Sequence, residues 1–370
     1  MDQTDISLYA LKLLTISRLK NILGKPYQVR FAVTYPTPGS NVFDTIFSEF
    51  SSDIYANFFD PRKRLFVGYL GCALIIALAW LTLLKKQKMT HAWRTCFDKQ
   101  AWLSRSSRAD GLIFIINRLL FTVLAPALLA KLTIATFMFQ WLQSTAGFRP
   151  LILLEDWQIA AGFTLWLFIL DDFARFYLHY LMHRWPVLWA FHKVHHSART
   201  MTPLTVLRTH PVEGILFSLR SSLVQGISIA LFVFLFANQV DLITVLGANV
   251  LVFAFNVTGS NLRHSHVAIH YWQPLERWLI SPAQHQIHHS TAPRHFDKNF
   301  GAALAVWDRL FGCLHLSEPD TRLSFGISKT EEANEHSLKQ LYLQPFAEAA
   351  LLIRNSLRKP RIFKTLIQRR

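Results

Sequence analysis

Cysteine is scarce in this chain of 370 residues. Cys72, Cys96 and Cys313 are the only three, they are widely separated, and no CxxC pair occurs. This composition excludes a disulfide framework and a thiolate metal site, and it favours a reducing, cytosol-facing compartment. Residues 1–30 also lack the compact apolar stretch and small-residue cleavage site of a signal peptide, so none is expected there.

Charged residues are also few. They make up 17% of the chain, against about 25% in an ordinary soluble domain, whereas hydrophobic residues make up 51% and phenylalanine alone contributes 30 residues. Long apolar runs next to basic stretches indicate an integral membrane protein. The net charge of +16 could suggest nucleic acid, but the basic residues flank the apolar runs, as positive-inside flanks near anionic lipid do. No nucleic-acid partner is predicted.

The apolar runs predict several membrane crossings. Residues 65–84 are bounded by Arg62-Lys63-Arg64 and Lys85-Lys86, and about 20 residues suffice for one span. Further runs cover residues 112–142, 157–170, 223–236 and 242–257.

The last two of these runs predict a helical hairpin that returns the chain to the face it left, so histidines before and after it share one side. The basic loop 85–110 marks that side as cytosolic, which predicts a multi-pass protein with a histidine site facing the cytosol. The number of spans before residue 157 stays open.

Histidine is concentrated in one part of the chain. Twelve of the 16 histidines lie between His179 and His289, and they form one HxxxH motif and two HxxHH motifs. Positions i, i+3 and i+4 of a helix share a face, so each motif directs several imidazoles to one point. The three motifs hold more nitrogen than one tetrahedral zinc can use, which predicts two metal ions. The predicted ligands are His179, His183, His192, His195, His196, His264, His266, His285, His288 and His289.

Four further residues are predicted to support these ligands. They are Asp172, His210, His270 and Asp308. A metal-bound imidazole commonly donates its other N–H to a carboxylate or a carbonyl group, which either acid could accept, although both could equally be ordinary helix-end acids. His210 could instead be purely structural, and which of His264, His266 and His270 are ligands stays open.

An all-imidazole site suits zinc, copper, iron or nickel. A transporter would be expected to place ionisable residues deep within its spans, whereas these histidines lie just beyond the apolar runs. That position suits attack on a hydrophobic substrate within the bilayer, and breaking an unactivated C–H bond favours iron with molecular oxygen. Two alternatives stay open: a zinc-dependent membrane hydrolase or hydratase, and a non-catalytic metal transporter or sensor.

The ordered set of motifs over residues 157–311 resembles the fatty acid hydroxylase/sterol desaturase superfamily of membrane di-iron oxygenases. The motifs are HYLMH (179–183), HKVHH (192–196), RTHPVE (208–213), RHSH (263–266), SPAQHQIHHS (281–290) and WDRLFG (307–312).

The resemblance implies a helical membrane core with a cytosolic cap that holds two irons. It implies hydroxylation, desaturation or ether-bond oxidation of lipids or sterols with oxygen and external electrons. It assigns ligand roles to the eight histidines of HYLMH, HKVHH and SPAQHQIHHS. His264 takes a family position, whereas many members have Asn at the place of His266.

No fused electron carrier is predicted. His210 is followed by Pro211 and Val212 rather than by the glycines of a haem-carrier HPGG motif, and no GxGxxG loop occurs. Electrons are therefore expected from a separate reductase or ferredoxin-like donor that docks on the basic cytosolic face.

Together these patterns predict an all-α integral membrane protein with a cytosolic, histidine-rich, di-metal cap. Residues 1–150 are predicted to hold one or more transmembrane helices, residues 151–318 the catalytic domain, and residues 319–370 a basic amphipathic tail. The predicted function is oxygen-dependent, di-iron hydroxylation or desaturation of a lipid or sterol C–H bond.

Overall fold

A computed structural model describes residues 41–123, 127–147, 154–236, 241–319, 322–327 and 335–358. These residues are mostly helical, as predicted, and one two-stranded antiparallel pair, β1 (Thr244–Val245) with β2 (Ala248–Asn249), accompanies the helices. Residues 1–40 of the predicted N-terminal region, residues 237–240 within the predicted hairpin and residues 359–370 of the predicted basic tail lie outside the described residues.

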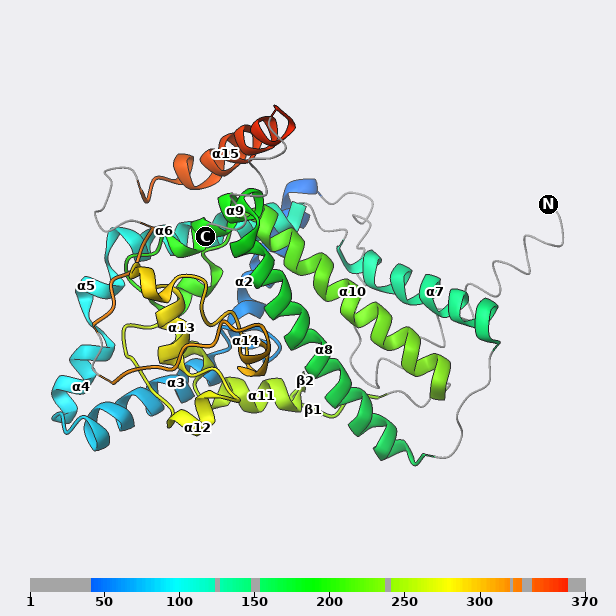
Figure 1. Ribbon diagram of the computed structural model, residues 1–370, viewed down its shortest axis with the longest axis horizontal. Coiled ribbons are helices and arrows are strands. Elements are labelled where there is room, and N and C mark those ends of the chain that lie inside the picture. The colour runs from blue at the N-terminus through cyan, green and yellow to red at the C-terminus, as the bar shows by residue number, and fades with distance from the viewer. Residues whose placement is uncertain are drawn as a thin grey trace.

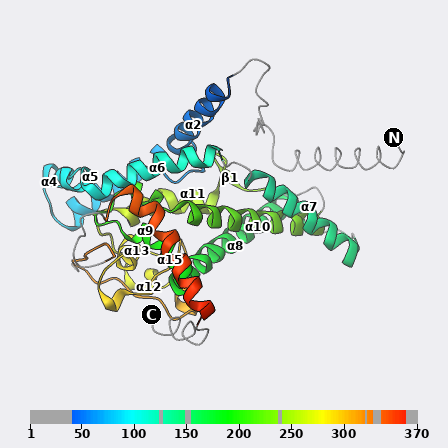
Figure 2. The same cartoon turned by 90° about the horizontal axis from the view of Figure 1, so that it is seen from above.

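Three long helices extend together away from the histidine-bearing body (Figures 1 and 2). These helices are α7 (Ala127–Ala146), α8 (Asp156–Arg184) and α10 (Pro211–Phe236), and both α7 and α8 pack against α10. The other described helices are α2 (Val42–Phe59), α3 (Val67–Ala79), η1 (Trp80–Leu84), α4 (Met89–Cys96), α5 (Lys99–Trp102), α6 (Arg105–Val123), α9 (Pro186–His196), η2 (Pro203–Leu207), α11 (Val250–Val257), η3 (Ser260–His264), α12 (Gln273–Glu276), α13 (Pro282–His288), η4 (Pro293–His295), α14 (Val306–Leu310) and α15 (Leu338–Arg358).

Helix α8 carries the first two predicted ligands, His179 and His183. It begins with a capping box, in which Glu155 and Gln158 satisfy each other's backbone N–H groups. Its 29 residues correspond to about 44 Å at 1.5 Å per residue, longer than a hydrocarbon core of about 30 Å. The helix therefore continues past its apolar first half. As predicted, it ends just before Pro186, which starts α9 at the first helical position.

Two helical segments are long and apolar enough to cross a membrane, by length and composition, among the residues that the structure describes. They are Val67–Leu84, which comprises α3 and η1, and Pro211–Phe236, which is α10. Only 22% and 33% of their apolar windows are buried inside the protein. Most of their residues are therefore only partly buried or exposed, unlike those of a core helix in a soluble domain.

The prediction of a second helical arm over residues 242–257 is wrong. Only its last eight residues are helical, as α11, and the strand pair precedes them. Thr164 of α8 fixes this shape, because its hydroxyl accepts from the Ile243 N–H and its carbonyl group accepts from the Asn249 side chain. Asn249 also caps α11. A contact made across the fold thus overrides the local apolar pattern.

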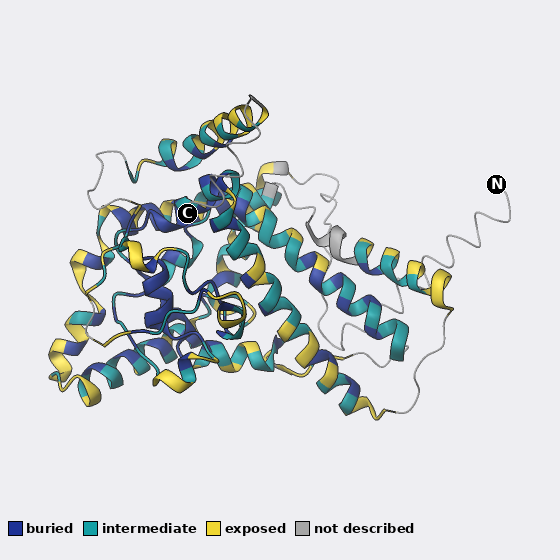
Figure 3. Ribbon diagram, in the orientation of Figure 1, coloured by how far each residue is buried: buried dark blue, intermediate teal, exposed yellow. Residues whose placement is uncertain are grey.

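Burial is concentrated where the histidines lie. The dark region of Figure 3 follows α9, α13 and the turns around them, whereas the long helices carry many exposed side chains. Helix α15 lies over α9, and Glu348 accepts a hydrogen bond from Lys193 there. The histidine-bearing segments thus form the best-protected part of the described fold.

A fully buried ion pair ties this body to α6. Arg208 donates to Asp110 at 2.8 Å, and both side chains are 0% exposed. The same guanidinium also donates to the Ser197 hydroxyl and to the Val194 carbonyl group at the end of α9. Arg208 therefore fixes α9 relative to α6.

We expect Arg208→Met to lower the free energy of unfolding by about 3–5 kcal/mol, because it leaves the Asp110 carboxylate buried without its partner. Thermal unfolding of the purified protein in detergent checks this. The control Arg62→Met removes the exposed pair with Asp60 and should cost at most about 1 kcal/mol. Adding Asp110→Leu to Arg208→Met should recover part of the loss; equal destabilisation by the two single variants would contradict the assignment.

Candidate metal centre

The structure brings nine histidines together in two adjacent clusters. The first cluster consists of His179 and His183 from α8, His192 and His196 from α9, and His288 from α13. The second cluster consists of His195 from α9, His264 from η3, and His285 and His289 from α13 and its C-cap. Within each cluster, one ring nitrogen of every histidine lies within 4.8 Å of the others.

Each HxxHH motif supplies both clusters. On α9, His192 and His196 face the first cluster while His195 faces the second; on α13, His288 faces the first while His285 and His289 face the second. The clusters are consequently in contact, and the rings of His196 and His289 stack with their centroids 4.4 Å apart. Two sites built from shared helices are suited to two ions that act together.

Local signals explain why α13 forms where it does. Ser281 caps the helix by accepting from the Gln284 N–H, and the Gln284 side chain accepts in return from the Ser281 N–H. Pro282 occupies the first helical position. This capping box sets the helical phase in which the three histidines of α13 point into the site.

The spacing of the nitrogens fits a metal ion. In the second cluster, His264 Nε2 lies 3.2 Å from His195 Nε2 and 3.0 Å from His285 Nε2. Metal–imidazole bonds of about 2.1 Å place neighbouring ligand nitrogens about 3.0–3.4 Å apart. A neutral imidazole has one N–H and cannot donate to two such neighbours at once, whereas one cation satisfies all of these lone pairs.

Hydrogen bonds on the outer side of the rings orient the first cluster. Nδ1 of His179 lies 2.9 Å from the Phe300 carbonyl oxygen, and Nδ1 of His288 lies 2.7 Å from that of Lys298. A carbonyl oxygen only accepts, so Nδ1 carries the hydrogen and Nε2 keeps its lone pair. Within the described chain, the buried Nε2 atoms of both histidines have no hydrogen-bond partner. They are positioned as ligands.

A carboxylate group, rather than a carbonyl group, orients the ring of His192. Glu213, at the start of α10, lies with Oε1 3.0 Å from Nδ1 of His192, and both side chains are almost fully buried. The Nε2 atom of His192 has no hydrogen-bond partner among the described residues either. The sequence alone assigned no role to Glu213, although this residue ends the RTHPVE motif. The available signal was an acidic residue three positions after His210.

Burial keeps the imidazoles neutral. Desolvation lowers the pKa of His192 to about 3, and it lowers the pKa of His195 to about 4 despite the opposing charge of Glu213. Burial and then the neighbouring His179 lower the pKa of His288 well below its ordinary value. Neutral imidazole is the form that binds a metal, so the site is ready for ions at neutral pH.

His266 is the predicted ligand that lies outside both clusters. The backbone of Ser265 is extended, with φ −147° and ψ 164°. The next residue, His266, places its Nε2 atom against the Thr95 carbonyl oxygen. Two predicted supporting residues also contact other parts of the protein: His210 Nε2 lies 3.1 Å from the Tyr342 carbonyl oxygen, and His270 Nδ1 lies 2.8 Å from the Ser317 hydroxyl.

Comparison with known proteins agrees with this geometry. Residues 164–313 match the family described as fatty acid hydroxylase. This segment is therefore similar to members of the fatty acid hydroxylase/sterol desaturase superfamily. The match contains all nine clustered histidines, so the family segment and the candidate metal centre coincide.

Characterised relatives act on lipids or sterols, by their names. The chain is 25% identical to the alkylglycerol monooxygenase of Xenopus tropicalis over 57% of this chain and 42% of that protein. It is 28% identical to the ornithine lipid hydroxylase of Rhizobium tropici over 52% and 53%, respectively. It is 26% identical to a Delta(7)-sterol 5(6)-desaturase of Gibberella zeae over 44% and 45%. The chain thus spans less than two thirds of each relative, and no solved structure matches it.

Asp308 stabilises the backbone that contacts His179. It accepts from the backbone N–H groups of Phe300 and Gly301 at 2.6 and 2.8 Å, and the Phe300 carbonyl group in turn contacts His179. Burial raises the pKa of Asp308 to about 7. A Cβ atom at Gly301 would lie 2.6 Å from an Asp308 oxygen, so only glycine fits this close approach.

Asp172 holds the other end of the loop that contains Phe300 and Gly301. It accepts from the Ala303 and Leu304 N–H groups at 2.8 and 3.1 Å and from the Trp307 indole at 3.0 Å. Both predicted acids thus position the loop whose carbonyl oxygens contact the histidines, rather than the histidines themselves.

We expect Glu213→Leu to weaken metal binding about 10- to 100-fold, because the N–H of His192 loses its acceptor and the ring loses its orientation. Chelator competition on the purified protein measures this affinity. Glu213→Gln retains an acceptor and should lose less. Glu348→Leu, which removes the contacts with Lys193 and Gln344 outside both clusters, should bind metal normally. Wild-type affinity in Glu213→Leu would show that the carboxylate does not position the ligand.

Proposed function

We propose that the protein is a membrane-bound, di-iron, oxygen-dependent oxidoreductase that hydroxylates or desaturates a C–H bond of a lipid or sterol. The observation that carries this proposal is the pair of adjacent all-imidazole clusters, with five and four histidines. One tetrahedral ion cannot use nine nitrogens, and imidazole ligands suit iron. The names of the relatives, two hydroxylating enzymes and a desaturase, support the reaction class.

The ligand roles are part of the proposal. His179, His183, His192, His196 and His288 would hold one iron, and His195, His264, His285 and His289 the other. When bound, the irons would supply the redox chemistry with molecular oxygen that an unactivated C–H bond requires. His266 is left out of the ligand set, because its ring lies against Thr95.

The chain's own contribution is orientation and the exclusion of water. Carbonyl groups of Lys298 and Phe300 and the carboxylate of Glu213 fix the imidazole tautomers from outside. The clustered rings are buried or nearly so, which protects a reactive centre from bulk solvent. These groups hold their positions before substrate arrives, so little reorganisation accompanies the reaction.

Membrane placement and electron supply complete the proposal. The two span-length apolar segments and the basic loop 85–110 support a multi-pass protein with the metal centre on the cytosolic side. The substrate would then enter from the bilayer, while oxygen reaches the same centre. Electrons would come from an external reductase or ferredoxin-like donor, and the net charge of +16 favours an acidic partner surface.

We expect the purified protein to contain two irons per chain. Elemental analysis after anaerobic purification measures the stoichiometry, and Mössbauer spectroscopy of protein loaded with iron-57 tests whether the irons are coupled. Stoichiometric zinc that stays redox-silent would instead support a membrane hydrolase, and metal flux in proteoliposomes would support a transporter. Either result would overturn the oxygenase proposal.

We expect His288→Ala to lose iron from the first cluster and to abolish oxygen-dependent turnover of lipid, while the protein still inserts into membranes. The matched control is His266→Ala, which removes an imidazole outside both clusters and should retain its iron. Oxygen consumption and mass spectrometry of the lipids report turnover, and iron content reports the site. Retained activity in His288→Ala would contradict the proposed ligand set.

A further inference from the structure

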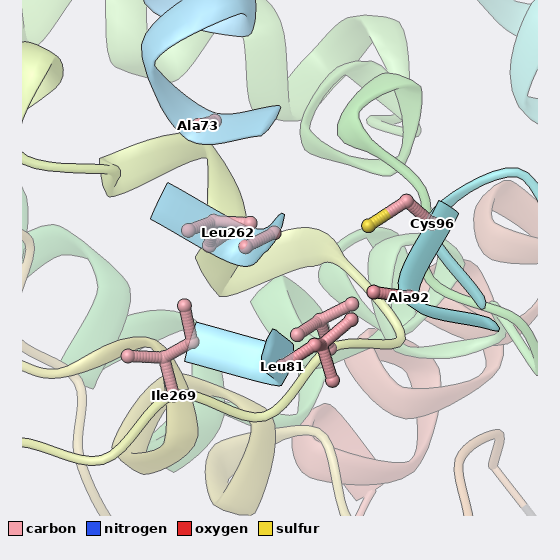
Figure 4. Close-up of a cluster of buried hydrophobic side chains, with 8 residues drawn as sticks. Ala73, Leu81, Ala92, Cys96, Leu262 and Ile269 are labelled. Carbon is pink, nitrogen blue, oxygen red and sulfur yellow. The ribbon is translucent and has the colours of Figure 1, made fainter. Parts of the chain in front are cut away.

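A large apolar cavity adjoins the segment that carries His264. It has a volume of about 480 Å³ and lies between α3, the α4–α5 region and the turns η2 and η3. Ala73 of α3, Cys96 of α4 and Leu262 of η3 line it, and Figure 4 shows these three residues in a cluster of buried hydrophobic side chains. This volume falls within the range of about 300–1,000 Å³ that is typical of ligand pockets.

The wall of the cavity presents hydrocarbon. Most of its polar side-chain atoms bond to the protein instead: Asn261 pairs with Arg64, the Ser265 hydroxyl donates to the Leu262 carbonyl group, and Nε2 of His266 contacts the Thr95 carbonyl group. Among the described residues, only Nδ1 of His266 has no partner in this wall. Among the described residues, no Asp, Glu, Lys or Arg side chain lines the cavity, and His266 is its one titratable imidazole. A sugar, nucleotide or amino acid would lose its hydrogen bonds there, whereas an alkyl chain would not.

The cavity lies between the candidate bilayer region and the segment that carries His264. Its first wall is α3, part of the span-length segment Val67–Leu84, whose outer side exposes large apolar residues such as Ile75. Its opposite wall includes Leu262 and Ser265, which lie on either side of His264. A chain entering from the membrane therefore reaches the element that carries a second-cluster histidine.

We propose that this cavity binds a single hydrocarbon chain of the lipid substrate and that Gly71 sets the width of the space. The proposal rests on the proposed function, because it names the part of the substrate that the oxidoreductase would hold. The bound group is an acyl or alkyl chain, and the polar headgroup of the lipid stays outside the cavity.

Gly71 is the position where the cavity is most readily narrowed. It lines the cavity from α3, and a Cβ atom added there would have no heavy atom within 4 Å. Because Gly71 is itself exposed, it lies at the mouth of the cavity, and a larger side chain there can enter the opening without displacing a neighbour. Gly111 of α6 is a matched control, because it is also helical, its added Cβ is equally free, and it does not line the cavity.

The test uses the full-length protein in liposomes and a photoreactive probe, 1-O-hexadecylglycerol with a diazirine in its alkyl chain. Peptide mass spectrometry locates the crosslinks. We expect labelling on α3 and next to His264, displaced by excess unlabelled 1-O-hexadecylglycerol. Gly71→Phe should reduce this displaceable labelling about tenfold, because the added ring occupies space that the hydrocarbon chain would otherwise fill. Gly71→Leu should reduce it less, and Gly111→Phe should leave it unchanged.

Labelling that excess alkylglycerol does not displace would show that bilayer lipid merely fills the cavity, and this would overturn the proposal. Equal labelling of Gly71→Phe and Gly111→Phe, with both variants retaining wild-type metal content, would overturn it as well. Because crosslinking requires no turnover, it is separable from the proposed function. Displaceable labelling in a protein that contains only zinc would support the chain-binding cavity while the oxygenase failed.

Discussion

The structure depends on keeping nine neutral imidazoles close together with lone pairs that face one another. Burial removes water from these rings and disfavours their protonated form, as the lowered pKa values of His192 and His195 show. Facing lone pairs repel unless a cation lies between them. The protein must therefore fix each ring from behind, and the arrangement of α8, α9, η3 and α13 follows from that requirement.

The loop from Asp297 to Asp308 is the main support on one side. Asp297 and Asn299 adopt left-handed conformations, with φ 58° and 57°, which turn the carbonyl groups of Lys298 and Phe300 toward the histidines. Such conformations are uncommon outside glycine, although Asn and Asp tolerate them best. The carboxylates of Asp172 and Asp308 secure the loop, and so two buried acids act on the centre without touching it.

Helical spacing explains how far the sequence predicted the site. Positions i, i+3 and i+4 determine which side chains share a face, and this was enough to nominate eight of the nine clustered histidines; His264 was nominated through the RHSH motif and the family resemblance, and its role was left open. It could not show how each HxxHH motif divides between two clusters, because that depends on how α9 and α13 pack. His266 differs from His264 through the extended Ser265 between them. Likewise, a contact from Thr164 shapes residues 242–249, and no local pattern records it.

The turn η3 contributes Leu262 to the wall of the cavity and His264 to the second cluster. Arg64 donates to the Ser260 carbonyl group from one side, and the Gln286 side chain donates to three carbonyl oxygens around His264 from the other. The cavity wall and the ligand therefore move as one unit. For a chain held in this cavity, the depth of insertion would determine which carbon approaches the second cluster. Regiochemistry would then follow from the shape of the cavity rather than from the reactivity of individual C–H bonds.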